Sequence, residues 1–458
     1  GLIFNGRLET LAAAIELTLA LGGTAEEALE RVLRAQSTTT LARMLETETV
    51  RATDVPGAGE VVLVYVPTAL RSHVFCVTDE SVMHARIEGQ AKWAPLRDQF
   101  REHLLQSPVG LSSAQRHERA HDIDAVSRAL ASHLIPTLFV APVATASKLS
   151  VIGVDLLGWI PFEALPVGGD PLGLTHAIAY APSFSVQAFL RARRASRSAG
   201  GGCARIVAAP HQSAQLGLPE LSIPPAWGEV ITELSPETAL VTGRAATFEG
   251  AVRACDEIEV LQLVAHGVRG RRVGNTAGLA LTPSEACSDG LVFADDWMQS
   301  SLPPVVLVTV CGSWRGAYRV GDGGAGEIAT SMILGGADCV AVTRADLSYG
   351  AALALSAEFH RAAATGVSPA EALRQARRAL ASSPDFSDPH FTSTMHFVGA
   401  AHESRAITPS KGRDHTAGAG IDSLPSAIRW TIGLLLLLGC GLALAWVLLR
   451  SRRAPATR

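Results

Sequence analysis

The segments LQLVAHGVRG, residues 261–270, and VVLVTVCGSWRG, residues 305–316, carry the clearest indication of the fold. Each runs through apolar residues to a reactive side chain followed by glycine, His266 in the first segment and Cys311 in the second. Continuous apolar runs of this length predict strands buried on both faces, as in a parallel sheet. Ligands bind beyond the carboxyl ends of such strands. We therefore expect His266 and Cys311 to lie at one edge of the sheet if the two strands are parallel neighbours.

Similar apolar strands alternate with amphipathic helices through the surrounding chain. The run CVAVT at residues 339–343 follows one predicted helix and precedes another at residues 349–366. A further helix begins at Ser368 and Pro369, which suit the N-cap and first helical positions. This order predicts an α/β fold, with a mostly parallel sheet that is covered by helices on both faces.

Changes in composition divide the chain into several parts. The first helical stretch is broken by GGT at residues 22–24, with Thr24 as N-cap of the next helix, and such a hairpin resembles the end of a helical repeat array. The stretch RARRASRSAGGG at residues 191–202 predicts a loop. The predicted parts are a helical hairpin at 1–50, a main domain at 51–402 with a strand-rich front at 58–90 and an α/β part at about 150–402, a flexible linker at 403–427, a transmembrane helix at 428–450 and a basic tail at 451–458.

The segment WTIGLLLLLGCGLALAWVLL, residues 430–449, contains no charged residue and predicts a membrane span. At about 1.5 Å per residue, a helix of this length covers roughly 30 Å, the thickness of the apolar core of a bilayer. Trp430 and Trp446 lie toward its ends, where indole rings favour the membrane interface. A slight excess of arginine after the span favours a cytoplasmic C-terminus. A single C-terminal span without a visible export signal instead leaves the large domain in the cytosol. We favour the second argument because the difference in charge is small. We expect a single-pass membrane protein with a C-terminal anchor and a cytoplasmic catalytic domain.

Composition argues against several classes of function. The formal net charge is −4, whereas a nucleic-acid binder needs a basic excess on its binding face. The seven cysteines are scattered and form no C-x-x-C pair, which argues against a zinc site or a disulfide framework. We therefore expect no nucleic-acid partner and no zinc site, and the thiol chemistry considered next needs no metal and no organic cofactor.

His266 and Cys311 together could form a nucleophile and its base. A thiol needs a base or a lowered pKa to attack at neutral pH, and an imidazole supplies either. Gly267 and Gly312 leave room for a peptide, and the backbone N–H groups of Gly267 and Cys311 could bind a tetrahedral oxyanion. The alternative is that Cys311 is a core thiol and His266 a hydrogen-bonded structural residue, and position alone leaves both interpretations open.

Eight short stretches resemble the CHAT domain, a caspase-like cysteine peptidase family often found after helical tetratricopeptide repeats. They occur in the order of the family between about residues 60 and 399: IPFEALP, AIAYAPS, VLQLVAHG, GLALTPS, DGLVFADDW, VVLVTVCGS, GGADCVAV and DPHFTSTMHFVGA. The resemblance implies a caspase-like α/β fold, with Cys311 as the nucleophile and His266 as the general base or proton donor.

The chain departs from the family pattern around the cysteine. The family commonly has Ser-Ala before the cysteine and Glu-Thr-Gly after it, whereas this chain has TV at residues 309–310 and GSW at residues 312–314. A tryptophan common in the family is replaced near VT at residues 342–343. These changes leave the predicted dyad in place and alter the region where the substrate pocket is expected.

Two charged residues, Arg344 and Asp346, are the candidates for that pocket, because caspase-like folds build it partly from the strand that precedes them. In a continuing strand they would share one face and neutralise each other, whereas a turn at Ala345 would separate them. Arg344 would select an acidic residue before the cut and Asp346 a basic one, and Asp346 aligns with an aspartate of the family. Both could instead be surface charges.

The sequence thus favours a membrane-anchored cysteine endopeptidase that performs limited proteolysis of a partner protein, which the resemblance places in bacterial signalling or defence. The expected partners are a protein or peptide substrate, the lipid bilayer through residues 430–449 and a regulatory protein at the helical N-terminus. The alternatives are a non-catalytic scaffold of the same fold and a cysteine hydrolase that acts on a small amide.

Overall fold

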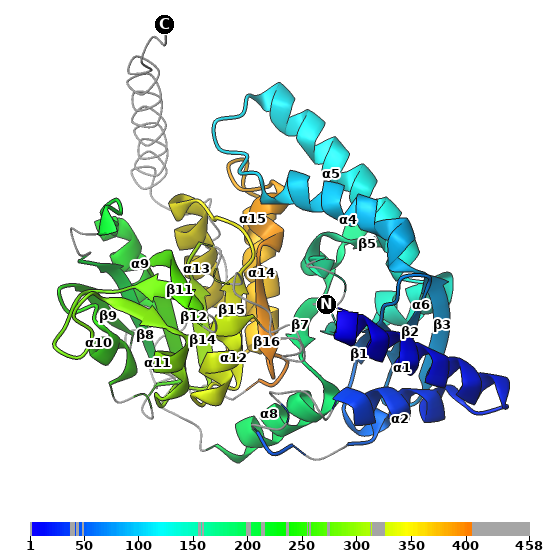
Figure 1. The fold of residues 1–458 in the computed structure, drawn as a ribbon. Helices are drawn as coiled ribbons and strands as arrows, with labels where there is room; N and C mark the ends of the chain where they lie inside the picture. The colour runs from blue at the N-terminus through cyan, green and yellow to red at the C-terminus, as the bar shows by residue number, and fades with distance from the viewer. Residues whose placement is uncertain are drawn as a thin grey trace, which may run out of the picture.

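A large mixed sheet runs through the molecule, and helices flank it (Figure 1). The structure is a computed structural model, and it describes residues 2–36, 42, 45–47, 50–153, 157, 160–197, 203–211, 216–234, 238–253, 255, 258–272, 275–311, 313 and 326–404. Among these residues the sheet has eleven strands in the order β3-β2-β1-β4-β7-β16-β15-β14-β10-β8-β9. The strands are β1 Glu60–Val66, β2 Arg71–Val77, β3 Val82–Glu88, β4 Lys148–Ile152, β7 Ala177–Ala181, β8 Ala204–Pro210, β9 Ala239–Gly243, β10 Val260–Val264, β14 Val305–Thr309, β15 Cys339–Thr343 and β16 Met395–Gly399.

Most of these strands pair in parallel. β15, β14, β10, β8 and β9 form one parallel series, and β1, β4 and β7 form another. The antiparallel pairs are β15 with β16, β1 with β2, and β2 with β3. The predicted mostly parallel sheet is therefore confirmed, with an antiparallel hairpin at the edge formed by the strand-rich front part.

Helices cover both faces of the sheet, as alternate residues of β14 show. Val305 and Leu307 pack in one core cluster with α13 and α14, while Val306 and Val308 pack in a second cluster with α12. This alternation is what a strand buried on both faces requires. The helices are α1 Leu2–Ala20, α2 Ala25–Gln36, α4 Gln90–Leu105, α5 Ser113–Leu134, α6 Thr137–Thr145, α7 Leu172–Thr175, α8 Phe184–Ser196, α9 Pro225–Leu234, α10 Phe248–Val252, α11 Ala294–Met298, α12 Glu327–Leu334, α13 Tyr349–Ala363, α14 Pro369–Ala381 and α15 Pro389–Ser393, with short 3₁₀ turns at Ala52–Asp54 and Phe162–Ala164.

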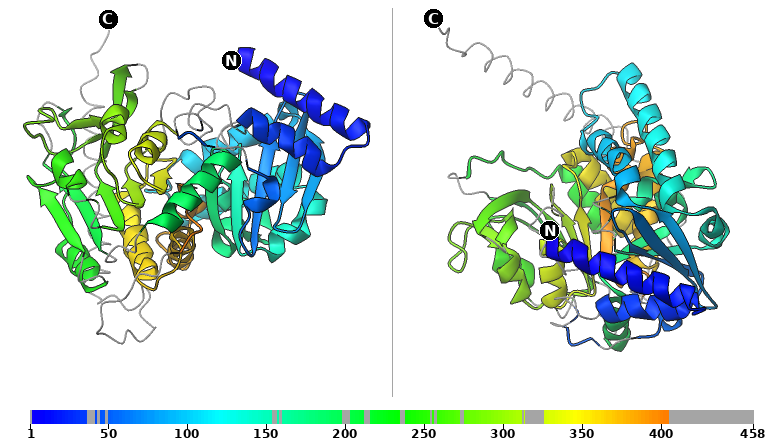
Figure 2. Two further views of the ribbon diagram at one scale, coloured as in Figure 1. Left: turned by 90° about the horizontal axis from the view of Figure 1, so that it is seen from below. Right: turned by 45° about the vertical axis from the view of Figure 1, so that its right-hand side comes forward.

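The N-terminal helices α1 and α2 contact each other and pack on the sheet. Thr24 is the N-cap of α2: its hydroxyl accepts from the Glu27 amide at 3.2 Å, and its own amide donates to the Glu27 carboxylate at 2.9 Å. These reciprocal bonds are a capping box. Leu29 lies in a core cluster with Val62 and Phe75 of the first two strands, and Figure 2 shows α1 lying across this end of the sheet.

Two smaller sheets lie outside the main one. One begins directly at His266 and consists of β11 His266–Arg272, β12 Asn275–Ala280 and β13 Leu291–Phe293, all paired antiparallel. The other pairs β5 Pro166–Val167 with β6 Asp170–Pro171. Because Ala265 alone separates β10 from β11, His266 stands at the point where the chain leaves the main sheet.

The prediction of a loop at residues 191–202 is wrong for its first half, because α8 continues through it. Arg193 forms an ion pair with Asp338 at 2.7 Å, and Arg194 forms one with Glu259 at 3.1 Å. Both carboxylates are buried just before strands of the main sheet. Ion pairing with these distant groups holds arginine-rich sequence in a helix that composition alone assigned to a loop.

The predicted membrane anchor lies outside the described residues. This holds for the transmembrane helix at 428–450, the basic tail at 451–458 and the linker from residue 405 onward. Among the helices that the structure describes, none by itself has the length and apolar character to cross a bilayer, and one sharply bent pair, α5 with α6, meets both criteria.

Candidate active site

β10 and β14 carry His266 and Cys311 to the same edge of the sheet. The two strands are parallel neighbours, and Val264 pairs with Thr309 where they end. His266 and Cys311 each follow two residues after these paired positions. The two strands are thus the parallel neighbours that the sequence prediction required, and they bring His266 and Cys311 to one edge of the sheet.

The turns that carry the two residues touch each other at Gly267. A Cβ atom placed on Gly267 would lie 2.4 Å from the carbonyl oxygen of Cys311 and 3.1 Å from Cγ1 of Val310. The first distance is far inside van der Waals contact, so glycine alone fits without a shift of the backbone. Gly267 thus sets how closely the histidine-bearing segment approaches Cys311. The oxyanion role of the Gly267 and Cys311 N–H groups stays a prediction.

One ring nitrogen of His266 is engaged by the backbone of a distant segment. Nε2 lies 2.8 Å from the carbonyl oxygen of Pro219. A carbonyl only accepts, so Nε2 carries the proton in this bond and Nδ1 of the neutral ring is left as an acceptor. The bond therefore selects the tautomer that can take a proton from a thiol. Sequence reasoning missed Pro219 because a backbone carbonyl leaves no residue-type signal.

The Cys311 thiol differs from the other cysteines in its surroundings. Among the six cysteines in the described part of the chain, Cys311 is the exposed one. Its Sγ lies 3.6 Å from the carbonyl oxygen of Leu347. By contrast, burial raises the pKa of Cys76 and of Cys339 to about 12, which keeps both thiols protonated. Cys311 is the cysteine whose placement suits nucleophilic chemistry.

The turn after Cys311 is held by the residues that depart from the family pattern. The Thr343 amide donates to Oγ of Ser313 at 2.8 Å, and the Ser313 amide donates to Oγ1 of Thr343 at 3.4 Å. The Thr343 hydroxyl also donates to the carbonyl oxygen of Val310. Ser313 and Thr343 therefore act as a pair that ties the end of β14 to β15, and they fix the backbone on both sides of Cys311.

A buried polar network links β10 and β14 beneath the site. Nε2 of Gln262 donates to Oγ1 of Thr309 at 3.0 Å, while its Oε1 accepts from Ser356 and from His360, both at 2.7 Å. All four side chains are buried. Satisfied buried networks of this kind hold strands and helices in one arrangement, and this one joins both site-bearing strands to α13.

The structure separates the two predicted pocket residues. The chain leaves β15 at Thr343, so Arg344 is buried while Asp346 is exposed. The Arg344 guanidinium pairs with Glu163 at 3.2 Å and lies over the ring of Tyr180 at 4.6 Å. This placement makes Arg344 part of the core and does not support its predicted pocket role.

Asp346, the other candidate for the pocket, lies at the protein surface. Its side chain is exposed, and its backbone carbonyl oxygen lies 3.1 Å from Nε2 of His390. That contact ties the segment after β15 to α15. The carboxylate is therefore presented near the site by a fixed backbone, and its role in substrate choice stays a prediction.

Sequence reasoning also missed the importance of Glu163. The residue lies in IPFEALP, which was recognised only as a family stretch, and it is fully buried among Arg344, Arg377 and Tyr180. A lone carboxylate inside an apolar run was the available signal. Within the described residues, no group of three or more His, Cys, Asp or Glu side chains is arranged to hold a metal ion.

A family model for the CHAT domain matches residues 124–403, more than half of the chain. The chain belongs to the CHAT domain family. The resemblance found in the sequence is thereby confirmed for the part that holds His266 and Cys311. The match begins well after the predicted domain start at residue 51, although β1, β2 and β3 of this CHAT protein belong to the same sheet.

Two solved structures are similar to this CHAT protein. The first is the Saccharomyces cerevisiae separase–securin complex, with a TM-score of 0.50 and 8% identity over 81% of this chain and 31% of that chain. The second is the Arg-specific cysteine proteinase gingipain R, with a TM-score of 0.42 and 9% identity over 70% of this chain and 78% of that chain. The CHAT protein thus spans less than a third of the separase-complex chain. Its fold is that of caspase-like cysteine peptidases. No curated protein matches the sequence.

Proposed function

We propose that this CHAT protein is a cysteine endopeptidase with Cys311 as nucleophile and His266 as base and proton donor. The contact between Gly267 and the Cys311 carbonyl carries the proposal, because it joins the segment that bears His266 to the segment that bears the exposed Cys311 thiol. The other ring nitrogen of that histidine is bound to Pro219. A nucleophile, a base and a group that orients the base are the parts that covalent catalysis needs.

The reaction follows from these positions. Nδ1 of His266 takes the thiol proton, and the sulfur of Cys311 attacks the scissile carbonyl carbon, whose π electrons move to the oxygen. The N–H groups of Gly267 and Cys311 would stabilise this oxyanion. The C–N bond then breaks as His266 gives the proton to the leaving amine. Water hydrolyses the thioester, which releases the carboxylic acid and restores the thiol.

We extend the proposal to limited proteolysis of a partner protein in bacterial signalling or defence. The similar separase structure contains a protein partner, securin. The N-terminal helical segment offers a place for a regulatory partner, because Leu17 of α1 and Leu21, in the turn directly after α1, are 61% and 79% exposed. Exposed apolar side chains that lie close together are typical of surfaces that another protein covers.

Membrane anchoring through residues 430–449 is part of the same proposal and rests on the uncharged sequence alone. A chain that ends at Ser426 should move from the membrane pellet to the supernatant in fractionation and keep its peptidase activity, because the anchor lies outside the catalytic sheet. A truncated chain that stayed in the pellet as firmly as the parent would contradict the anchor.

The peptidase proposal is tested with a thiol-reactive peptide probe. Cys311→Ala should abolish labelling, and His266→Ala should slow it by about a hundredfold or more, the usual worth of a general base. Cys287→Ala is the matched control, since Cys287 is partly exposed but has its pKa raised to about 11 by burial and by Asp289. Labelling that survives both dyad substitutions would refute the assignment.

Cleavage assays with the parent protein and the Cys311→Ala variant separate the alternatives. A non-catalytic scaffold would show no cleavage of any peptide by the parent protein. A small-amide hydrolase would turn over a short amide and leave polypeptides intact. Cleavage of polypeptides by the parent and its loss in Cys311→Ala support the endopeptidase.

A further inference from the structure

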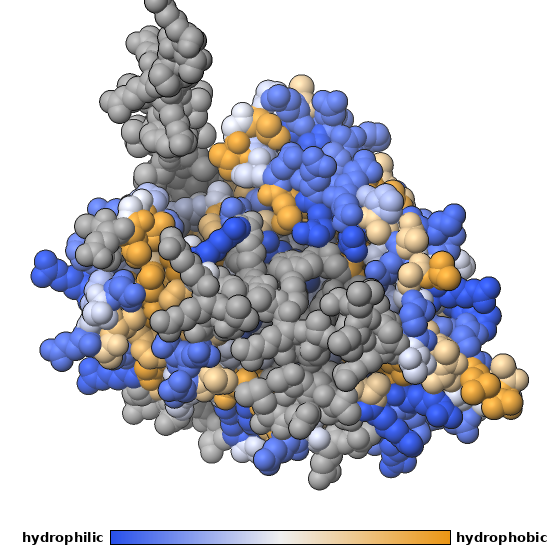
Figure 3. Space-filling view, in the orientation of Figure 1, coloured by the Kyte–Doolittle hydropathy of each residue, from blue (hydrophilic) through white to orange (hydrophobic). Residues whose placement is uncertain are grey.

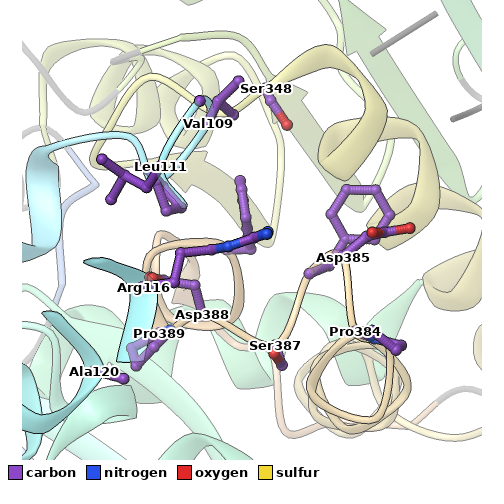
Figure 4. A pocket seen from close by; sticks show the side chains of 14 residues that line it. Val109, Leu111, Arg116, Ala120, Ser348, Pro384, Asp385, Ser387, Asp388 and Pro389 are labelled. Carbon is purple, nitrogen blue, oxygen red and sulfur yellow. The ribbon is translucent and has the colours of Figure 1, made fainter. Parts of the chain in front are cut away.

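A pocket of about 360 Å³ opens beside the segment that contacts the Cys311 thiol. Its walls are the loop between α4 and α5, the first turns of α5, Ser348 and residues 384–391 at the start of α15. Figure 4 shows Val109 and Leu111 on one side of the pocket, facing the segment from α15 across it. The pocket is therefore built from three separate parts of the chain.

The pocket and the thiol share one backbone segment. The thiol sulfur of Cys311 lies 3.6 Å from the carbonyl oxygen of Leu347, and the next residue, Ser348, lines the pocket. The antiparallel pairing of Thr343 with Met395 brings the start of β16, and with it α15, to the end of β15. The pocket therefore begins one residue along the chain from the carbonyl that the thiol contacts.

The charges in the pocket are unequally compensated. Asp388 is neutralised, since it pairs with Arg119 at 3.1 Å and accepts from the His390 amide at 2.8 Å. Arg116 is exposed, and within the described part of the chain its guanidinium makes no ion pair or hydrogen bond, whereas its backbone amide donates to the carbonyl oxygen of Ser112. Figure 4 shows its guanidinium reaching the middle of the pocket, while Asp385 lies at the opposite wall.

Much of the remaining lining is apolar. Val109, in the loop between α4 and α5, is 44% exposed, and Figure 3 shows an apolar patch at this end of a largely hydrophilic α4–α5 surface. Phe386 and Phe391 are buried behind the pocket. Such walls suit the methylene groups of a side chain whose polar end meets Arg116.

We propose that this pocket binds a glutamate or aspartate side chain of the polypeptide substrate, held by Arg116. The inference rests on the proposed function, because it takes the bound polypeptide to be the substrate. A guanidinium fits a carboxylate with two parallel hydrogen bonds, which selects an acid over the amide of the same shape. Arg116 is thus a specificity residue, and it selects a position of the substrate separate from the one predicted for Asp346.

The test uses the full chain with Cys311→Ala, so that bound peptides stay intact. The probe is a library of short capped peptides that carry glutamate, glutamine or lysine at one position in turn. At one position, glutamate should bind about three- to tenfold more tightly than glutamine, the range for a partly exposed charged pair. Adding Arg116→Gln should remove the difference, and Arg116→Glu should shift the preference to lysine.

The matched control is Arg128→Gln, which removes an exposed arginine from the same helix outside the pocket and should leave the glutamate preference unchanged. Equal binding of glutamate and glutamine peptides at every position would overturn the proposal. A preference that persists in Arg116→Gln, or a lysine preference that Asp385→Asn removes, would overturn it as well. Peptide binding is measured without turnover. A parent protein that cleaves nothing would therefore refute the peptidase proposal, while the binding data would still show whether Arg116 selects a carboxylate.

Discussion

The neighbouring strands β14 and β15 are followed by polar residues whose surroundings are opposite. Cys311, beyond the end of β14, is exposed and contacts a backbone carbonyl. Arg344, directly after β15, is 4% exposed and paired with a carboxylate from another segment. A reactive group at an open strand end can meet a substrate, whereas a charge at a covered end must be neutralised inside the protein. Both residues lie at the edge of the sheet, so burial rather than position distinguishes a side chain available for reaction, Cys311, from one that stabilises the core, Arg344.

The covered end is organised around Glu163. Its carboxylate accepts from Arg344 at 3.2 Å, from Arg377 at 3.3 Å and from the Tyr180 hydroxyl at 2.7 Å. Burial lowers the pKa of Arg377, and attraction to Glu163 opposes this shift. The buried carboxylate of Glu163 therefore partly neutralises two guanidinium groups, and its loss would leave both without their negative partner.

The largest effect is expected from Glu163→Gln, which should lower the free energy of unfolding by about 3–5 kcal/mol because it breaks a buried ion pair and leaves a charge uncompensated. Asp124→Asn is the control, since it removes an exposed carboxylate paired with Arg128 and should change stability little. Urea denaturation measures both. If both variants lost the same free energy of unfolding, the expected difference between buried and exposed charges would be refuted.

A second prediction concerns His360, beneath the open end. Burial lowers its pKa from 6.5 to about 4. Between about pH 6.5 and pH 4 the unfolded chain therefore binds this proton while the folded chain does not, so stability falls as the pH falls through this window and is unaffected above it. The loss attributable to His360 should reach about 3 kcal/mol.

Unfolding free energies of the parent and of His360→Gln, measured across this range, check the expectation. The variant should lose less stability than the parent between neutral pH and about pH 4, because it lacks the titrating group. Other buried histidines contribute to both proteins and cancel in the comparison. Parallel pH profiles would show that His360 titrates normally in the folded protein.

The smallest stability effect is expected at the open end itself. Gly267→Ala should lower the free energy of unfolding by about 1–3 kcal/mol, since the added Cβ must displace the Cys311 carbonyl. The rate at which the probe labels Cys311 should fall by a much larger factor than this loss of stability alone would cause. Gly228→Ala in α9 is the control, because a Cβ there meets only Cδ2 of Leu240 at 3.4 Å. Normal labelling of Gly267→Ala would show that this contact does not position the thiol.

Sequence reasoning placed His266 and Cys311 at neighbouring strand ends and did not foresee the burial of Arg344, for the same reason. Each of His266, Cys311 and Arg344 comes at or after the end of an apolar run, and hydrophobic periodicity reports such ends well. It does not report what covers them. Arg344 meets Glu163 across 181 residues of sequence, a separation over which no local pattern carries information. The arginines of α8 were assigned to a loop on the same local ground.

The sequence by itself determined the alternation of strands and helices, the parallel sheet and the two reactive residues at neighbouring strand ends, because these follow from the spacing of apolar residues along the chain. Only the tertiary structure decided that Pro219 holds the ring of His266, that Glu163 removes Arg344 from the surface and that a pocket adjoins the thiol segment. Each of these depends on segments far apart in sequence coming into contact, where burial changes what a charge or a carbonyl can do.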